Sequence, residues 1–217
     1  GENDILFGQH VITKIRLETK GAALDPETFS TILPFLWSIL EIKYRHLNFN
    51  QATRTIALTI LSNHAGMRNL RTSVRREVLR VLIDVLKYYP YLNTQAGNAL
   101  VSAGKFMVPK DLDPILDGLL SPAVNVRTIC LKALAEYPPL STNNNLFEVS
   151  PEDYEPANPK LIYYLFLATL DSDPTVAESA NKLWKKLNKP LGDKFLDYYM
   201  PLLDMFMKRS SRLFNDD

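Results

Sequence analysis

The sequence predicts an all-α protein in which consecutive helical hairpins stack into an α-solenoid. Three observations favour this fold class. Apolar residues recur at spacings of three and four along most of the chain, which is the period of an amphipathic helix. Prolines and capping residues separate these stripes at short intervals. Two neighbouring pairs of stripes also resemble each other at a separation of fifty residues, as expected of a repeat protein.

The first two expected helices have clear starts. Asp25 suits an N-cap and Pro26 suits the first helical position, so a helix begins here and its apolar stripe continues to Leu40. Asn50 can cap a second helix at about 51–64. The short turn between the two helices makes them a hairpin.

The remaining elements follow from similar signals. Pro90 ends a helix at about 73–89 because proline cannot continue it, and Asn93 starts the partner helix, which runs to about 107. Asp111 opens a short helix that reaches Leu120. Further apolar stripes predict helices at about 124–137, 160–170, 175–188 and 193–207. Residues 5–17 fit neither a strand pattern nor a helix pattern.

The repeat relates the later hairpins to each other. Val126 and Val176 each begin the second helix of a pair, and each is followed by a small residue that lets two backbones approach, Cys130 or Ala180. Prolines recur in or near first helices, at Pro34, Pro114 and Pro201. This combination is similar to the HEAT repeat. We therefore expect a HEAT-type α-solenoid of about four to five helical hairpins, with residues 1–217 a single HEAT-repeat segment of a longer protein.

One sequence feature imitates this pattern at another position. Val74-Arg75, followed by Val78, looks like the start of a second helix at Val126-Arg127. The pairing of 73–89 with the helix after Asn93 instead assigns it to a first helix.

An insertion at 138–159 interrupts the array. It holds five prolines and a run of asparagines, which oppose a packed core. Four acidic side chains and no basic one give it a local charge of −4. We expect an acidic loop with Glu148, Glu152, Asp153 and Glu155 on it.

Composition excludes several classes of protein. Apolar residues make up 46% of the chain and the net charge is +1, which argues against disorder. The longest apolar run is too short for a membrane span, so we expect no membrane contact. The single cysteine excludes a disulfide framework and suits a reducing compartment.

The balanced charge conceals two unlike halves. Residues 1–110 carry a net charge of +6 and residues 111–217 a net charge of −5. Several basic residues lie at or near a helix N-terminus, where positive charge is unfavourable. No local feature compensates for the charge of this basic cluster, which suggests an anionic partner. A solvated face, or pairing with acidic residues of an adjacent repeat, is the competing interpretation. The candidate partner-binding residues are Arg68, Arg71, Arg75, Arg76, Arg80 and Lys87, of which Arg76, Arg80 and Lys87 share one helical ridge.

No catalytic constellation emerges from the sequence. His10, His46 and His64 lie on different segments without metal-ligand spacing, and a glycine-rich phosphate loop is absent. Cys130 occupies a small-residue slot, which favours packing over nucleophilic chemistry. Asp111, with Asp113 and Asp117, is interpreted as a favourable acid at a helix start. We expect no enzyme activity, no metal, no cofactor and no small-molecule substrate.

Particular stretches resemble one protein family. They are Phe29-Ser30-Thr31-Ile32-Leu33-Pro34, Leu112-Asp113-Pro114-Ile115-Leu116-Asp117-Gly118, and Leu170-Asp171-Ser172-Asp173-Pro174 with Leu183-Trp184 after it. In this order they resemble the general control non-derepressible translational activators, the very large HEAT-repeat activators of the initiation-factor-two-alpha kinase. The similar region falls just before the part of that family that resembles elongation factor three.

The resemblance implies a function that the residues alone do not. It implies a cytoplasmic parent protein with protein partners, which binds ribosomes through ribosomal RNA or protein and relays amino-acid starvation to its kinase. This segment would be a non-catalytic scaffold. The alternative is another HEAT-repeat interaction scaffold, such as a tubulin-binding, transport or chromatin adaptor. Tubulin-binding modules display basic and Trp residues on hairpin turns, whereas Trp37 and Trp184 fall inside helical stripes.

Overall fold

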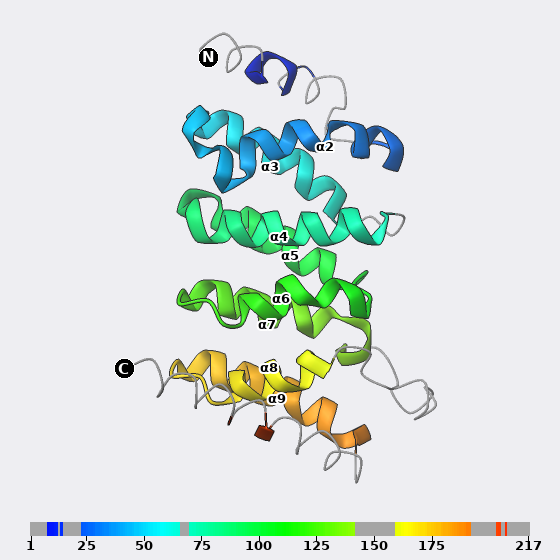
Figure 1. The fold of residues 1–217 in the computed structure, drawn as a ribbon, viewed down its shortest axis with the longest axis vertical. Helices are drawn as coiled ribbons and strands as arrows, with labels where there is room; N and C mark the ends of the chain where they lie inside the picture. Colours follow the sequence, from blue (N-terminus) through cyan, green and yellow to red (C-terminus); the bar gives the residue numbers. More distant parts are fainter. Residues whose placement is uncertain are drawn as a thin grey trace.

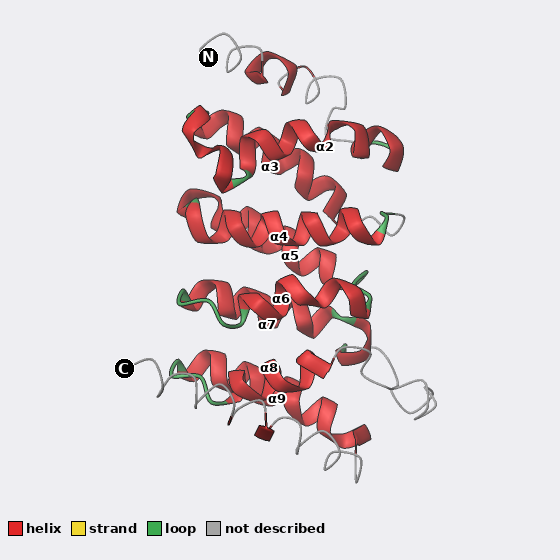
Figure 2. Ribbon diagram, in the orientation of Figure 1, coloured by secondary structure: helices red, strands yellow, loops and turns green. Residues whose placement is uncertain are grey.

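The computed structural model describes residues 8–12, 14, 23–65, 70–141, 159–191, 203–204 and 207. Within these ranges every regular element is helical, and Figure 2 shows helices joined by short loops. The all-α prediction is confirmed. None of the described helices is long and apolar enough to span a membrane.

Four consecutive helical hairpins make up most of the described part of the chain. They are α2 (Pro26–Leu40) with α3 (Gln51–Ala65), α4 (Thr72–Tyr88) with α5 (Asn93–Gly104), α6 (Leu112–Gly118) with α7 (Val124–Glu136), and α8 (Pro159–Thr169) with α9 (Pro174–Leu191). Short 3-10 helices adjoin them: η1 (Ile42–Leu47), η2 (Pro90–Leu92), η3 (Pro109–Asp111) and η4 (Pro138–Leu140).

The hairpins stack one after another (Figure 1). The first helices α2, α4, α6 and α8 pack in chain order, and the second helices α3, α5, α7 and α9 do the same. Turns within the hairpins gather along one side of the stack, at the left of Figure 1, and the connection from α5 to α6 lies on the opposite side. Because α4 pairs with α5, the assignment of Val74-Arg75 to a first helix is confirmed.

Local sequence explains where the first helices begin. The Asp25 carboxylate accepts a hydrogen bond from the Thr28 amide at 3.0 Å, as an N-cap should. The Asn50 side chain accepts one from the Thr53 amide at 2.8 Å. Pro34 lies inside α2, as its position in the apolar stripe predicts. Both predicted caps are confirmed.

Some predicted boundaries differ from the structure. Helix α5 ends at Gly104 rather than near residue 107, and the next residues form a turn in which the Phe106 amide bonds the Ala103 carbonyl at 3.1 Å. Asp111 ends the 3-10 helix η3 and is the N-cap residue of α6, close to the predicted start, whereas α6 ends at Gly118 and not at Leu120. Residues 8–12 are helical, where the sequence pattern was undecided. Most of the helix expected at 193–207 lies outside the described residues.

Small residues let the second helices approach closely. A Cβ added to Gly104 would meet the Ala133 carbonyl oxygen, so α5 lies directly against the α7 backbone. Cys130 fits against Gly118 in the same way. Val126, Cys130, Val176 and Ala180 are all fully buried, which confirms the packing expected of the fifty-residue repeat.

The predicted acidic insertion is described only at its start. Residues Pro138–Leu140 form the 3-10 helix η4, and Leu140 is fully buried, so this first part belongs to the packed array. Lys186 of α9 donates to the Leu140 carbonyl at 3.3 Å. Glu148, Glu152, Asp153 and Glu155 lie outside the described residues.

Candidate functional site

The basic cluster predicted from the sequence lies mostly on α4. Arg71 is the N-cap residue of this helix, and its side chain does not cap it. Arg75, Arg76, Arg80 and Lys87 follow along α4, while Arg68 lies outside the described residues. The structure separates these cations into a buried one and an exposed set.

Arg75 is buried, with only 6% of its surface exposed. Its Nε donates to Oδ2 of Asp111 at 2.7 Å, and its guanidinium also reaches the Leu70 carbonyl at 3.4 Å. The prediction that Arg75 belongs to a partner-binding surface is therefore corrected, because its charged group faces the interior of the stack. Asp111 is the N-cap residue of α6, as an acid at the helix start, and it also neutralises this buried guanidinium, a partner that the sequence did not reveal.

The ridge of Arg76, Arg80 and Lys87 is exposed, as the helical projection predicts. Arg76 donates from Nε and a terminal nitrogen to the Lys110 carbonyl at 3.0 and 2.6 Å. Arg80 pairs with the buried carboxylate of Glu41 at 3.0 Å and with Asp84 at 3.6 Å. These contacts hold the two arginines against the neighbouring hairpins, and the charge of Arg80 is offset by them.

Carboxylates of adjacent hairpins neutralise Arg75 and Arg80, which the sequence did not reveal. Glu41 follows α2 in the first hairpin and lies 39 residues from Arg80, while Asp111 adjoins the third hairpin and lies 36 residues from Arg75. The competing interpretation, pairing with acidic residues of an adjacent repeat, is thus confirmed for these two arginines. The argument that uncompensated charge requires an anionic partner loses its support at both positions.

A third pair of this kind joins the last two described hairpins. Arg127 on α7 donates from Nε and a terminal nitrogen to the two carboxylate oxygens of Asp171 at 2.7 and 2.9 Å. Partial burial opposes ionisation of Asp171, but the hydrogen bonds from Arg127 and the Asp173 amide hold its pKa below the ordinary value. Arginine–carboxylate pairs therefore link successive hairpins both in the row of first helices, from Arg75 and Arg80 on α4, and in the row of second helices, from Arg127 on α7. We call these two rows the layers of the stack.

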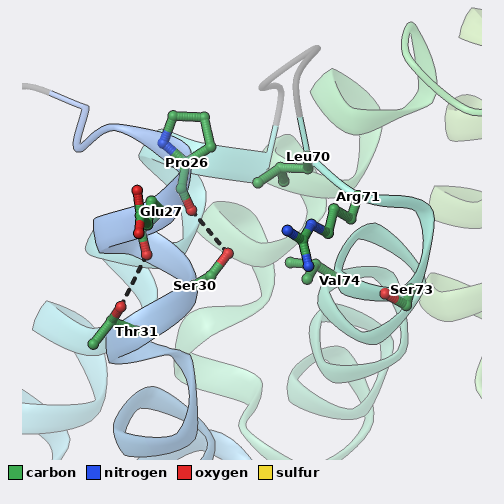
Figure 3. A pocket seen from close by; sticks show the side chains of 8 residues that line it. All are labelled: Pro26, Glu27, Ser30, Thr31, Leu70, Arg71, Ser73 and Val74. Carbon is green, nitrogen blue, oxygen red and sulfur yellow. Dashed lines mark hydrogen bonds between the residues drawn. The ribbon is translucent and has the colours of Figure 1, made fainter.

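A groove of about 640 Å³ lies between the first turns of α2 and α4 (Figure 3). Its lining comprises Pro26, Glu27, Ser30, Thr31, Leu70, Arg71, Ser73 and Val74. The Ser30 and Thr31 hydroxyls donate to carbonyls one helical turn earlier, at 2.8 and 3.0 Å. Among the residues that line this groove, Arg71 is the only cation, and the lining holds no histidine or cysteine that could act as a base or nucleophile.

Cys130 and His64 both serve packing. Burial raises the pKa of the Cys130 thiol to about 12, so it stays protonated at neutral pH, and its predicted packing role is confirmed. His64 stacks on Phe29 with ring centroids 4.2 Å apart. Its Nε2 accepts the Leu24 amide at 2.7 Å and its Nδ1 contacts the Ile60 carbonyl at 2.6 Å. These bonds suit a neutral ring, and burial lowers its pKa.

Within the described ranges, no three His, Cys, Asp or Glu side chains gather as metal ligands would. His10 and His46 are exposed on separate segments. Asp113 interacts with Lys160 at 3.5 Å, and Asp117 is exposed whereas Asp111 is buried. The geometry is that of a stack of packed helices with an extended outer surface.

Comparison with known proteins gives two relatives of one kind. The chain is 24% identical over 185 residues to the eIF-2-alpha kinase activator GCN1 of Dictyostelium discoideum, an alignment that covers 85% of the chain. It is 26% identical over 215 residues to the eIF-2-alpha kinase activator GCN1 of Saccharomyces cerevisiae, with 89% of the chain covered. The chain spans only 6% and 7% of the length of these relatives. No family model matches the chain, and no solved structure does.

Proposed function

We propose that this chain is a non-catalytic scaffold segment, a HEAT-type solenoid, of a ribosome-associated translational regulator that activates the initiation-factor-two-alpha kinase in amino-acid starvation. The observation that carries the proposal is the similarity to two kinase activators over 85% and 89% of the chain. The sequence resemblance points to the same family. A cytoplasmic location and protein partners follow from the proposal.

The stacked hairpins support a scaffold role. Each described hairpin packs against the next, so the array is elongated and each hairpin leaves part of its surface open to partners. The described residues bring together no nucleophile, base and oxyanion donor. A surface of this shape suits extended contact with a large partner.

The ridge on α4 is the part of the predicted basic cluster that supports ribosome contact. Of the three ridge cations, Arg80 is paired to Glu41 and Asp84, whereas no ion pair within the described residues joins Arg76 or Lys87 to a carboxylate. Ribosomal RNA is a dense array of negative charge, so cations on an exposed ridge strengthen its binding in a salt-dependent way.

Cosedimentation tests the proposal. The chain should pellet with ribosomes, with binding that weakens as salt increases, and Arg76→Glu with Lys87→Glu should reduce it, each lost phosphate contact lowering the log–log salt slope by about 1. Lys132→Glu with Lys185→Glu, which reverses two exposed cations on α7 and α9, is the matched control and should pellet like the wild type.

Two outcomes would contradict the proposal. The first is equal pelleting of the ridge variant and the control variant at every salt concentration, with both variants folded by circular dichroism. The second is pelleting with microtubules and not with ribosomes, which would instead favour a tubulin-binding scaffold. Trp37, buried in α2 with its indole N–H donating to Glu77 at 3.2 Å, is not available on a hairpin turn for such a role.

A further inference from the structure

We propose that the turns within the first two hairpins form a binding surface for unpaired RNA. This surface, the tyrosine edge, consists of exposed residues of η1, of the last turn of α4 and of η2. Its members are Lys43, Tyr44, Arg45, His46, Lys87, Tyr88 and Tyr91. The proposal goes beyond the scaffold function because it assigns a site and a ligand chemistry whether or not the RNA belongs to a ribosome.

The two turns are neighbours on the same side of the stack (Figure 1). Helix η1 packs against α4. The buried carboxylate of Glu41 joins them, since it pairs with Lys43 at 2.8 Å and with Arg80 of α4 at 3.0 Å. The contact between η1 and α4 and the shared carboxylate of Glu41 therefore hold the two turns next to each other.

The tyrosines expose their rings to solvent. Tyr44, Tyr88 and Tyr91 are 36%, 50% and 43% exposed, although large aromatic side chains usually bury more of their surface. Tyr91 meets the buried ring of Tyr89 edge to face, with centroids 6.2 Å apart, and the Arg54 guanidinium lies 4.8 Å from the Tyr89 centroid. Packing thus orients Tyr91 before any ligand binds, which lowers the entropic cost of stacking a base on it.

Positive charge surrounds these rings. Lys43 lies 5.0 Å from the Tyr44 centroid, and Arg45, His46 and Lys87 are exposed beside the tyrosines. The nearby carboxylates do not oppose a polyanion, because Glu41 is 3% exposed and, like the partly buried Asp84, already contacts Arg80. Aromatic platforms flanked by cations are the combination that binds single-stranded nucleic acid.

The corresponding turns of the last two described hairpins have different chemistry. Their exposed apolar side chains are aliphatic, Leu120 and Val124 between α6 and α7 and Leu170 between α8 and α9. Asp117 is exposed beside the first of these turns, and the half-buried Asp173 lies in the second. Aliphatic side chains offer no ring to stack on a base and carboxylates repel phosphate, so the proposed RNA surface ends after the second hairpin.

Unpaired RNA fits this edge better than a protein segment does. The rings of Tyr44, Tyr88 and Tyr91 are exposed among cations, so they suit a ligand that combines flat aromatic groups with negative charge. Unpaired bases, unlike those of a duplex, are free to stack on such rings.

Fluorescence anisotropy with a labelled oligouridine of about 10 nucleotides tests the proposal. The chain should bind it, and Tyr44→Leu with Tyr88→Leu and Tyr91→Leu should weaken binding by about tenfold or more, because each stacked base contributes appreciably. Leu120→Ala with Val124→Ala and Leu170→Ala, on the other turns of the same edge, is the matched control and should leave affinity unchanged. Lys43→Gln with Arg45→Gln should lower the log–log salt slope by about 1.4.

Several results would overturn the proposal. One is an absence of oligouridine binding; another is equal affinity of the tyrosine variant and the wild type. Equal binding of a duplex of the same length would show that charge alone acts. If the tyrosine variant loses ribosome pelleting while its oligouridine binding is unchanged, the edge contacts a protein and not RNA. Lys87 belongs to both the ridge and the tyrosine edge, whereas the tyrosine variant leaves Arg76 and Lys87 unchanged. Oligouridine binding by the tyrosine variant therefore tests the edge separately from the ribosome proposal.

Discussion

Two Val-Arg pairs in this chain look alike in sequence and occupy different layers of the stack. Val74-Arg75 begins the first helix of the second hairpin, and Val126-Arg127 begins the second helix of the third hairpin. Each arginine pairs with an aspartate of the following hairpin at 2.7 Å, Asp111 for the first and Asp171 for the second. The Val-Arg motif therefore links one hairpin to the next through an arginine–aspartate pair, whether it lies on a first helix or on a second helix.

The surroundings of the two pairs differ. The Arg75 and Asp111 side chains are 7% and 0% exposed, and Asp111 Oδ1 has no hydrogen-bond partner in the described structure. The Arg127 and Asp171 side chains are 11% and 9% exposed, and both Asp171 oxygens accept from Arg127. The pair at Arg75 is thus more deeply buried and less well satisfied, so loss of either partner there should cost more.

The largest effect is expected from Arg75→Ala. Asp111 would remain buried without its cation, and breaking a buried pair in this way costs about 3–5 kcal/mol. The free energy of unfolding from urea titration measures this loss. Arg75→Met with Asp111→Leu removes both charges and should recover most of the stability. A loss at Arg75→Ala no greater than that at Arg127→Ala would remove the distinction between the two junctions.

Gly104→Ala should produce a smaller effect than Arg75→Ala, comparable to that of Arg127→Ala, at the junction between the same two hairpins but in the row of second helices. Its new Cβ would meet the Ala133 carbonyl oxygen, and forcing α5 away from α7 costs about 1–3 kcal/mol. Differential scanning calorimetry should record a lower Tm. Ser102→Ala, at an exposed position of α5, controls for changes in helix propensity. An unchanged Tm for Gly104→Ala would mean that this junction tolerates a wider helix spacing.

Arg127→Ala should cost about 1.5–3 kcal/mol at neutral pH, since it removes charge-assisted hydrogen bonds at the better satisfied junction. The loss should depend on pH. Because the folded-state pKa of Asp171 is lowered from 3.8, its contribution is fully present above about pH 5 and disappears as the pH falls through the folded-state value. Urea midpoints of wild type and variant, compared from pH 7 downward, should therefore converge below about pH 3.8. A constant difference down to pH 3 would show that packing, not charge, links these hairpins.

The smallest effect is expected from Arg76→Ala. Its guanidinium donates to the Lys110 carbonyl from an exposed position, where such contacts contribute about 0–1 kcal/mol. The urea midpoint should shift little, in contrast to the change at the adjacent Arg75. A loss as large as that of Arg75→Ala would mean that the exposed ridge is also part of the link between hairpins.

The sequence predicted most of the fold because the signals were local. The caps at Asp25 and Asn50, and the small residue at Cys130, act within one hairpin, so their neighbours in the chain reveal their role. The candidate site was predicted less well. Arg75 and Arg76 are adjacent in one basic run, yet one faces the interior and the other faces solvent.

His64 and the tyrosine edge were missed for a related reason. A histidine in an apolar stripe carries no sign of the Leu24 amide, 40 residues away, that bonds its ring. Tyr44 and Tyr91 come from different hairpins, and their shared edge exists only once the hairpins stack. The signal that could have found this edge is the placement of tyrosines and cations in both turns between predicted helices.

The sequence by itself determined the helical class, the order of the hairpins and the positions where small residues let helices approach. These features depend on helical period, capping and side-chain size, which act over a few residues. Only the tertiary structure decided which cations form ion pairs between hairpins and which remain unpaired at the surface of the described part. An ion pair requires two groups within about 4 Å whatever their separation in the chain, and the partners of Arg75, Arg80 and Arg127 lie 36, 39 and 44 residues away.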